Sequence, residues 1–124
     1  MIFGDEKHAP VRKVEGEERR LLKVLLSPAL QGGFEGIAAG LTILPPGSHS
    51  DLTGHEEGEL FFVVSGEGKI LVDGETRDLY PTATVWAPPF AVHQLINDSD
   101  QECKIFWVLS PAGREANIIK NSIK

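Results

Sequence analysis

The sequence predicts an all-β protein in which short antiparallel strands form a single barrel or sandwich. Three observations support this prediction. Short apolar runs recur along the chain, Gly and Pro residues separate them, and no segment combines the length and periodicity of a long helix. The 124 residues correspond to one domain of ordinary size. We therefore expect one fold and one functional site.

The turn residues set the limits of the expected strands. Asp73-Gly74 is a favoured type I′ hairpin pair, and prolines bound several other runs. The predicted strands cover residues 21–26, 34–44, 59–64, 69–72, 75–79, 82–87, 92–97 and 103–109. Around them we expect an N-terminal arm (1–19), a barrel (20–112) and a C-terminal tail (113–124) with a helical turn at 114–120.

Residues 21–26 are apolar on both faces of a strand, so this strand requires cover on both sides. We expect a second subunit to supply the outer cover, which predicts a homodimer. A core helix turn is the alternative interpretation of the same run.

Composition excludes several classes of partner. The net charge is −6 and the basic residues are dispersed, so no basic stripe is present to bind nucleic acid. No apolar run approaches the length of a membrane span, and the N-terminus lacks a secretory pattern, which predicts a cytoplasmic protein. Cys103 is the only cysteine, so no disulfide forms within one chain, and we expect a buried thiol.

Three residues are candidates for an interior polar cluster: His55, Glu59 and His93. Glu59 begins a predicted strand and shares a face with Phe61, so its side chain should point into the barrel. His93 shares a face with Leu95. Imidazole nitrogens and carboxylate oxygens are common metal ligands, and an unpaired carboxylate in the interior would be costly.

The spacing around His55 and Glu59 matches a family pattern. Gly47, five residues, Thr53-Gly54-His55, three residues, Glu59, six residues and Gly66 follow one another. This segment resembles the first motif of the cupin superfamily, which has a further histidine at the position of Thr53. The second cupin motif is matched at Pro88, His93 and Asn97, whereas its two glycines are replaced by Thr82 and Phe90.

The resemblance implies the cupin fold, a double-stranded β-helix or jelly-roll barrel, with motif side chains holding a metal at the barrel mouth. Carried over to this sequence, the ligands are His55, Glu59 and His93, with His49 or Thr53 as further candidates. Two histidines and one carboxylate suit a divalent transition metal such as Fe, Mn, Zn or Ni and leave coordination positions open. Alternatively, without its first histidine, the site holds no metal and forms a hydrogen-bonded cluster.

These residues lead to two hypotheses about function. The first is a metal-dependent enzyme of the dioxygenase, isomerase or lyase type that acts on a small polar or carboxylate-containing molecule, with Glu57 as a candidate base. The second is a cupin without metal that binds or senses a sugar or organic acid. In either case we expect Phe61, Trp86, Phe90 and Trp107 to line the pocket, although plain core packing explains each of them equally well.

Overall fold

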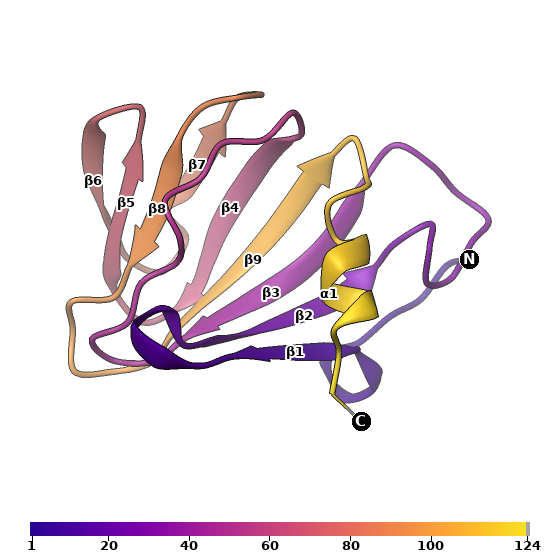
Figure 1. The fold of residues 1–124 in the computed structure, drawn as a ribbon, viewed down its shortest axis with the longest axis horizontal. Coiled ribbons are helices and arrows are strands. Elements are labelled where there is room, and N and C mark those ends of the chain that lie inside the picture. The colour runs from indigo at the N-terminus through magenta and orange to yellow at the C-terminus, as the bar shows by residue number, and fades with distance from the viewer. Residues whose placement is uncertain (124) are drawn as a thin grey trace.

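The computed structural model describes residues 1–123, whose strands form two antiparallel sheets that face each other (Figure 1). The larger sheet has the order β1 (Val11–Val14), β2 (Arg20–Leu26), β3 (Ala38–Leu44), β9 (Cys103–Ser110), β4 (Gly58–Ser65) and β7 (Thr84–Ala87). The smaller has the order β6 (Glu75–Leu79), β5 (Gly68–Val72) and β8 (His93–Ile96). The expected all-β jelly-roll class is confirmed.

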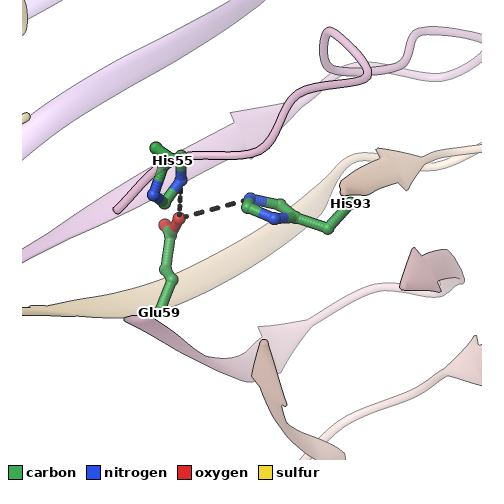
Figure 2. Close-up of side chains that lie close together, drawn as sticks. All are labelled: His55, Glu59 and His93. Carbon is green, nitrogen blue, oxygen red and sulfur yellow. Dashed lines mark ion pairs between the residues drawn. The ribbon is translucent and has the colours of Figure 1, made fainter. Parts of the chain in front are cut away.

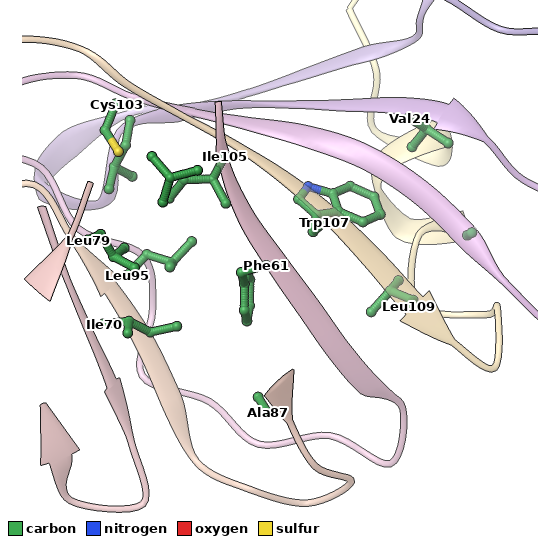
Figure 3. Close-up of a cluster of buried hydrophobic side chains, with 13 residues drawn as sticks. Val24, Phe61, Ile70, Leu79, Ala87, Leu95, Cys103, Ile105, Trp107 and Leu109 are labelled. Atoms are coloured by element: carbon green, nitrogen blue, oxygen red, sulfur yellow. The ribbon is translucent and has the colours of Figure 1, made fainter. Parts of the chain in front are cut away.

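The core lies between the two sheets, and strand β9 supplies alternate residues to it (Figure 3). Cys103, Ile105, Trp107 and Leu109 are all buried, as a strand with one inward face requires. Trp107 lies over Gly40 of β3, where a Cβ atom would overlap the indole ring. Burial raises the pKa of the Cys103 thiol to about 11, so this thiol is a packing group rather than a nucleophile.

Strand β2 forms as predicted for residues 21–26, which rules out the helix-turn alternative. On its outer side, Lys23 binds Glu6 with 2.9 Å between Nζ and Oε2, and Lys104 of β9 binds the same carboxylate at 2.6 Å. Glu6 begins the short 3-10 helix η1 (Glu6–His8). The N-terminal segment therefore supplies part of the outer cover that β2 requires.

The segments expected as an N-terminal arm and a C-terminal tail both contain regular secondary structure that packs on the barrel. Residues 11–14, within the expected arm, pair with β2 as strand β1, and a second 3-10 helix, η2 (Gly16–Glu18), connects the two strands. After β9, the helix α1 (Ala116–Lys120) packs against β1 and β2, and Ile123 pairs with Val11. Within residues 1–123, no helix combines the length and apolar character needed to cross a membrane.

Two turns adopt a left-handed backbone at positions where the sequence departs from the cupin glycines. Thr82 has φ = 75° and Phe90 has φ = 68°. Only glycine adopts this conformation without steric cost, and a β-branched threonine is especially unfavourable there. Thr82 and Phe90 therefore hold a left-handed backbone at the expense of local strain.

We predict that Thr82→Gly stabilises the fold by about 1 kcal/mol, because it relieves the left-handed strain. The side chain that it removes is exposed, so little packing is lost. The free energy of unfolding in urea is the measurement. Thr76→Gly, at an exposed position in the extended strand β6, is the control and should destabilise instead. A decrease in stability for Thr82→Gly would contradict the strain argument.

Candidate metal centre

Three different segments bring the candidate ligands together (Figure 2). His55 lies in the loop before β4, Glu59 is the second residue of β4, and His93 is the first residue of β8. Glu59 enters the barrel because β4 pairs it with the inward-facing Leu109 of β9. One ligand atom from each residue lies within 4.8 Å of the other two.

The imidazole rings are fixed by hydrogen bonds to backbone carbonyls. Nδ1 of His55 is 2.9 Å from the carbonyl oxygen of Glu57, and Nδ1 of His93 is 3.1 Å from that of Ala91. A carbonyl oxygen only accepts hydrogen bonds, so Nδ1 donates in both rings. In the neutral imidazole, the opposite nitrogen, Nε2, then carries a lone pair.

Both Nε2 atoms face one carboxylate oxygen. The distance from Glu59 Oε1 to Nε2 is 3.3 Å for His55 and 3.5 Å for His93. Three lone-pair acceptors directed at one another need a cation between them, either a proton on an imidazole or a metal ion. Ligands at about 2.1 Å from one ion are separated by about 3.0–3.4 Å, so the two distances from Glu59 to the histidines are close to those expected around a metal.

The site is largely shielded from solvent, with side-chain exposures of 6% for His55, 13% for Glu59 and 8% for His93. Burial acts against the Glu59 carboxylate, but the hydrogen bonds and charges of the two histidines outweigh it, so its pKa is lowered. Burial likewise opposes the charged form of His93, but its pKa is raised by its bonds to Glu59 and the Ala91 carbonyl. The pocket thus keeps its carboxylate ionised and attracts positive charge.

The cluster lies in the wall of a cavity of about 570 Å³ that could hold a small molecule. Apolar side chains and charged groups share this wall. The lining residues include Leu22, Phe61, Leu95, Trp107 and Leu109 together with Arg12, Arg20, Asp51, Arg114 and Glu115. The site therefore offers apolar walls and several directed polar groups close to the three candidate ligands.

The other candidate ligands have different positions. Thr53 pairs with His93 through two backbone hydrogen bonds and lines the cavity, so it stands beside the cluster. The structure places His49 elsewhere: its ring contacts the Ser50 carbonyl and Gln94, and it is not among the lining residues. Glu57 is buried behind His55, with Oε1 3.4 Å from Nδ1 of that ring, and it does not line the cavity either.

Two of the four aromatic candidates line the cavity, Phe61 and Trp107. Trp86 precedes the inward-facing Ala87, so strand alternation places its ring on the outer side, where it is 52% exposed and covers Gly58. Phe90 is 73% exposed. The backbone of Phe90, rather than its ring, supports the site, because its amide donates to the His55 carbonyl at 2.7 Å.

Sequence reasoning did not identify the charged residues of the cavity, chiefly Arg12, Arg20, Arg114 and Glu115. They belong to the first two strands and to the segment after β9, and no motif marks them. The signal that could have found Glu115 is the apolar pair Ile118-Ile119 that follows it, which suggests that the terminal turn packs on the barrel.

Comparison with known proteins agrees with this architecture. Residues 40–109 match the family described as Cupin domain. The chain belongs to the cupin family. This match covers His55, Glu59 and His93, and it omits β1, β2 and the segment after β9.

The proteins that this chain resembles are named for different activities. The chain is 38% identical over 88 residues to gentisate 1,2-dioxygenase 1 of Aquipseudomonas alcaligenes, which is 68% of this chain but only 25% of that protein. It is 32% identical over 104 residues to the polyketide synthase CurC of Streptomyces cyaneus, covering 82% and 67% of the two chains. The solved structure of KdgF from Halomonas sp. shares the fold with a TM-score of 0.78, 18% identity and coverages of 94% and 98%.

Proposed function

We propose that this cupin is a metal-dependent enzyme that acts on a small polar, carboxylate-containing molecule. The observation that carries the proposal is the convergence of two imidazole lone pairs on the Glu59 carboxylate in the wall of a cavity of about 570 Å³. We assign His55, Glu59 and His93 as the ligands of a divalent transition metal of the Fe, Mn, Zn or Ni class.

The residues beside the cluster support an open coordination site. Thr53 stands next to His93 where the resemblance places a further histidine, and its short side chain leaves room on the cavity side. A metal bound there would supply Lewis-acid polarisation of a substrate oxygen, or oxygen activation if it is iron. The chain's own groups orient the two imidazoles through the Glu57 and Ala91 carbonyls and keep the carboxylate ionised.

Oxidative chemistry is the reaction class that we propose first. Two histidines and one carboxylate are the ligand set of many non-haem Fe(II) oxygenases, and the similarity to a gentisate dioxygenase points the same way. The aromatic walls formed by Phe61 and Trp107 suit a planar substrate.

A second candidate is non-oxidative chemistry on a polyketide-like substrate. The similarity to the polyketide synthase CurC supports it, because that alignment spans more of both chains than the alignment to the dioxygenase. In this reaction the metal would act as a Lewis acid, and the cavity would fix the conformation of the substrate.

We further propose that the cupin is a homodimer, as the apolar strand β2 predicts. Leu21 points away from the cavity side of β2, because its neighbours Arg20 and Leu22 line the cavity. It remains only partly buried, since the N-terminal segment covers the strand incompletely. A second copy of the chain is the occupant that we propose for this face.

Metal analysis tests the ligand assignment. We predict close to one metal ion per chain in protein purified without chelator, and loss of this metal in His93→Ala because one of the three donors is removed. His49→Ala is the matched control and should keep its metal, since His49 does not line the cavity. Equal trace metal in all three proteins would contradict the assignment.

Oxygen consumption separates the two reaction classes. We predict that the Fe(II)-loaded protein consumes oxygen with dihydroxybenzoates and that Glu59→Gln abolishes this uptake, because the anionic ligand is lost. An oxygen electrode with product analysis is the measurement. Product formation without oxygen uptake would instead support the polyketide-type reaction, and no turnover with either substrate class would favour a binding protein.

Light scattering coupled to size-exclusion chromatography tests the dimer. We predict a dimeric mass for the wild type and a monomeric mass for Leu21→Glu, because a charge would be buried at the interface. Leu52→Glu, at an exposed loop position, should stay dimeric. A monomeric wild type would contradict the proposal.

A further inference from the structure

The charged groups of the cavity divide into paired and unpaired sets. Burial lowers the pKa of Arg20, while the charges of Asp51 and Glu18 oppose this effect. Arg20 also donates to Asp51 Oδ1 at 3.1 Å and to the Glu18 carbonyl at 2.7 Å. The positive charge of Arg20 is therefore matched by acids of the chain itself.

Arg12 and Arg114 lack such partners. Among residues 1–123, neither forms an ion pair with a carboxylate. Arg12 donates to the neutral amide oxygen of Asn117 at 2.6 Å, and Arg114 is an exposed residue that lines the cavity. Arg114 and the candidate ligands His55, Glu59 and His93 line the same cavity.

Glu115 holds this part of the chain against the barrel. Its side chain is almost fully buried, at 2% exposure, and it accepts hydrogen bonds from Ser27 Oγ and from the Gly113 amide, each at 2.6 Å. Both oxygens of this carboxylate are thus occupied within the chain. The bonds fix the residue next to Arg114, and the segment after β9 forms one wall of the cavity.

The other acids of the cavity do not pair with Arg12 or Arg114 among residues 1–123. Glu59 faces the two histidines, Asp51 binds Arg20, and the charge of Glu18 acts on Arg20, although no ion pair joins these two side chains. The two arginines without carboxylate partners are therefore the groups in this cavity that are available to an anion from outside.

We propose that Arg114 and Arg12 form an anion subsite that binds the carboxylate of the ligand, and that Glu115 is the residue that positions Arg114 over the cavity. The guanidinium groups donate paired, charge-assisted hydrogen bonds whose geometry suits a carboxylate. This inference rests on the proposed function and deepens it, because it assigns the ligand's charge and the residues that select it.

The test compares a carboxylate with its uncharged amide. Salicylate and salicylamide are titrated by calorimetry into the protein as purified and after loading with Zn²⁺, which has no redox chemistry. We expect the wild type to prefer salicylate, and Arg114→Gln to weaken salicylate binding about tenfold because a charge-assisted hydrogen bond is lost. Salicylamide binding should not change, and Arg12→Gln should weaken salicylate in the same direction.

The matched control is Arg77→Gln, which removes the same charge from an exposed position in β6, where Arg77 pairs with Glu75. It should leave both affinities unchanged, and Arg114→Lys, which keeps the charge but loses the paired donors, should keep only part of the preference for the acid. Equal binding of acid and amide by the wild type would overturn the subsite. Unchanged salicylate affinity in Arg114→Gln, or an equal loss for the amide, would overturn it as well.

The positioning role has its own readout. Ser27→Ala and Glu115→Gln should both reduce the preference for salicylate over salicylamide while metal content stays constant, because Arg114 loses its fixed place. A loss of thermal stability with an unchanged preference would overturn this role. Metal content measured on the same samples separates the two proposals. Absence of metal together with an Arg114-dependent preference for the acid contradicts only the metal enzyme. Bound metal without an Arg114-dependent preference contradicts only the subsite.

Discussion

Strand β9 pairs with both β3 and β4, and this double pairing determines which side chains enter the barrel. A shift of one residue in either register would turn the inward face of the neighbouring strand to solvent. The pairing of Glu59 with Leu109 and of Phe61 with Trp107 therefore fixes the apolar core and the carboxylate of the site at once. The packing that stabilises the fold also brings an acidic group into the interior.

An ionised carboxylate in an apolar interior is unfavourable unless positive charge or hydrogen-bond donors compensate it. His55 and His93 provide this compensation only together with a cation, either a proton on Nε2 or a metal ion, because their Nδ1 atoms are already committed to backbone carbonyls. The arrangement is complete only with a cation in the middle. The backbone carbonyls thus determine which nitrogen of each ring faces Glu59, although no backbone atom belongs to the cluster of ligand atoms.

Most of the fold could be predicted from the sequence, because most strands from β2 to β9 have clear apolar runs and turn residues bound them. The polar strand β6 could be predicted from the Asp73-Gly74 hairpin pair that precedes it. The cluster could also be predicted, since Glu59 and His93 sit at inward positions of their strands. Strand β1 was missed because its four residues alternate too briefly to show a period, and pairing with β2 creates it. Trp86 and Phe90 were expected in the pocket, but the direction of a side chain at a strand end or turn depends on backbone angles that composition does not reveal.

The part of the chain that matches the cupin family ends before the segment that carries Arg114 and begins after the strands that carry Arg12 and Arg20. The residues that match the family and the cavity arginines therefore lie in different parts of the chain. Two proteins with the same motif residues can differ in the charge of their cavities, and an alignment restricted to the motifs would not detect the difference. Ligand preference among such barrels is better compared through the segments that flank the matched strands than through the strands themselves.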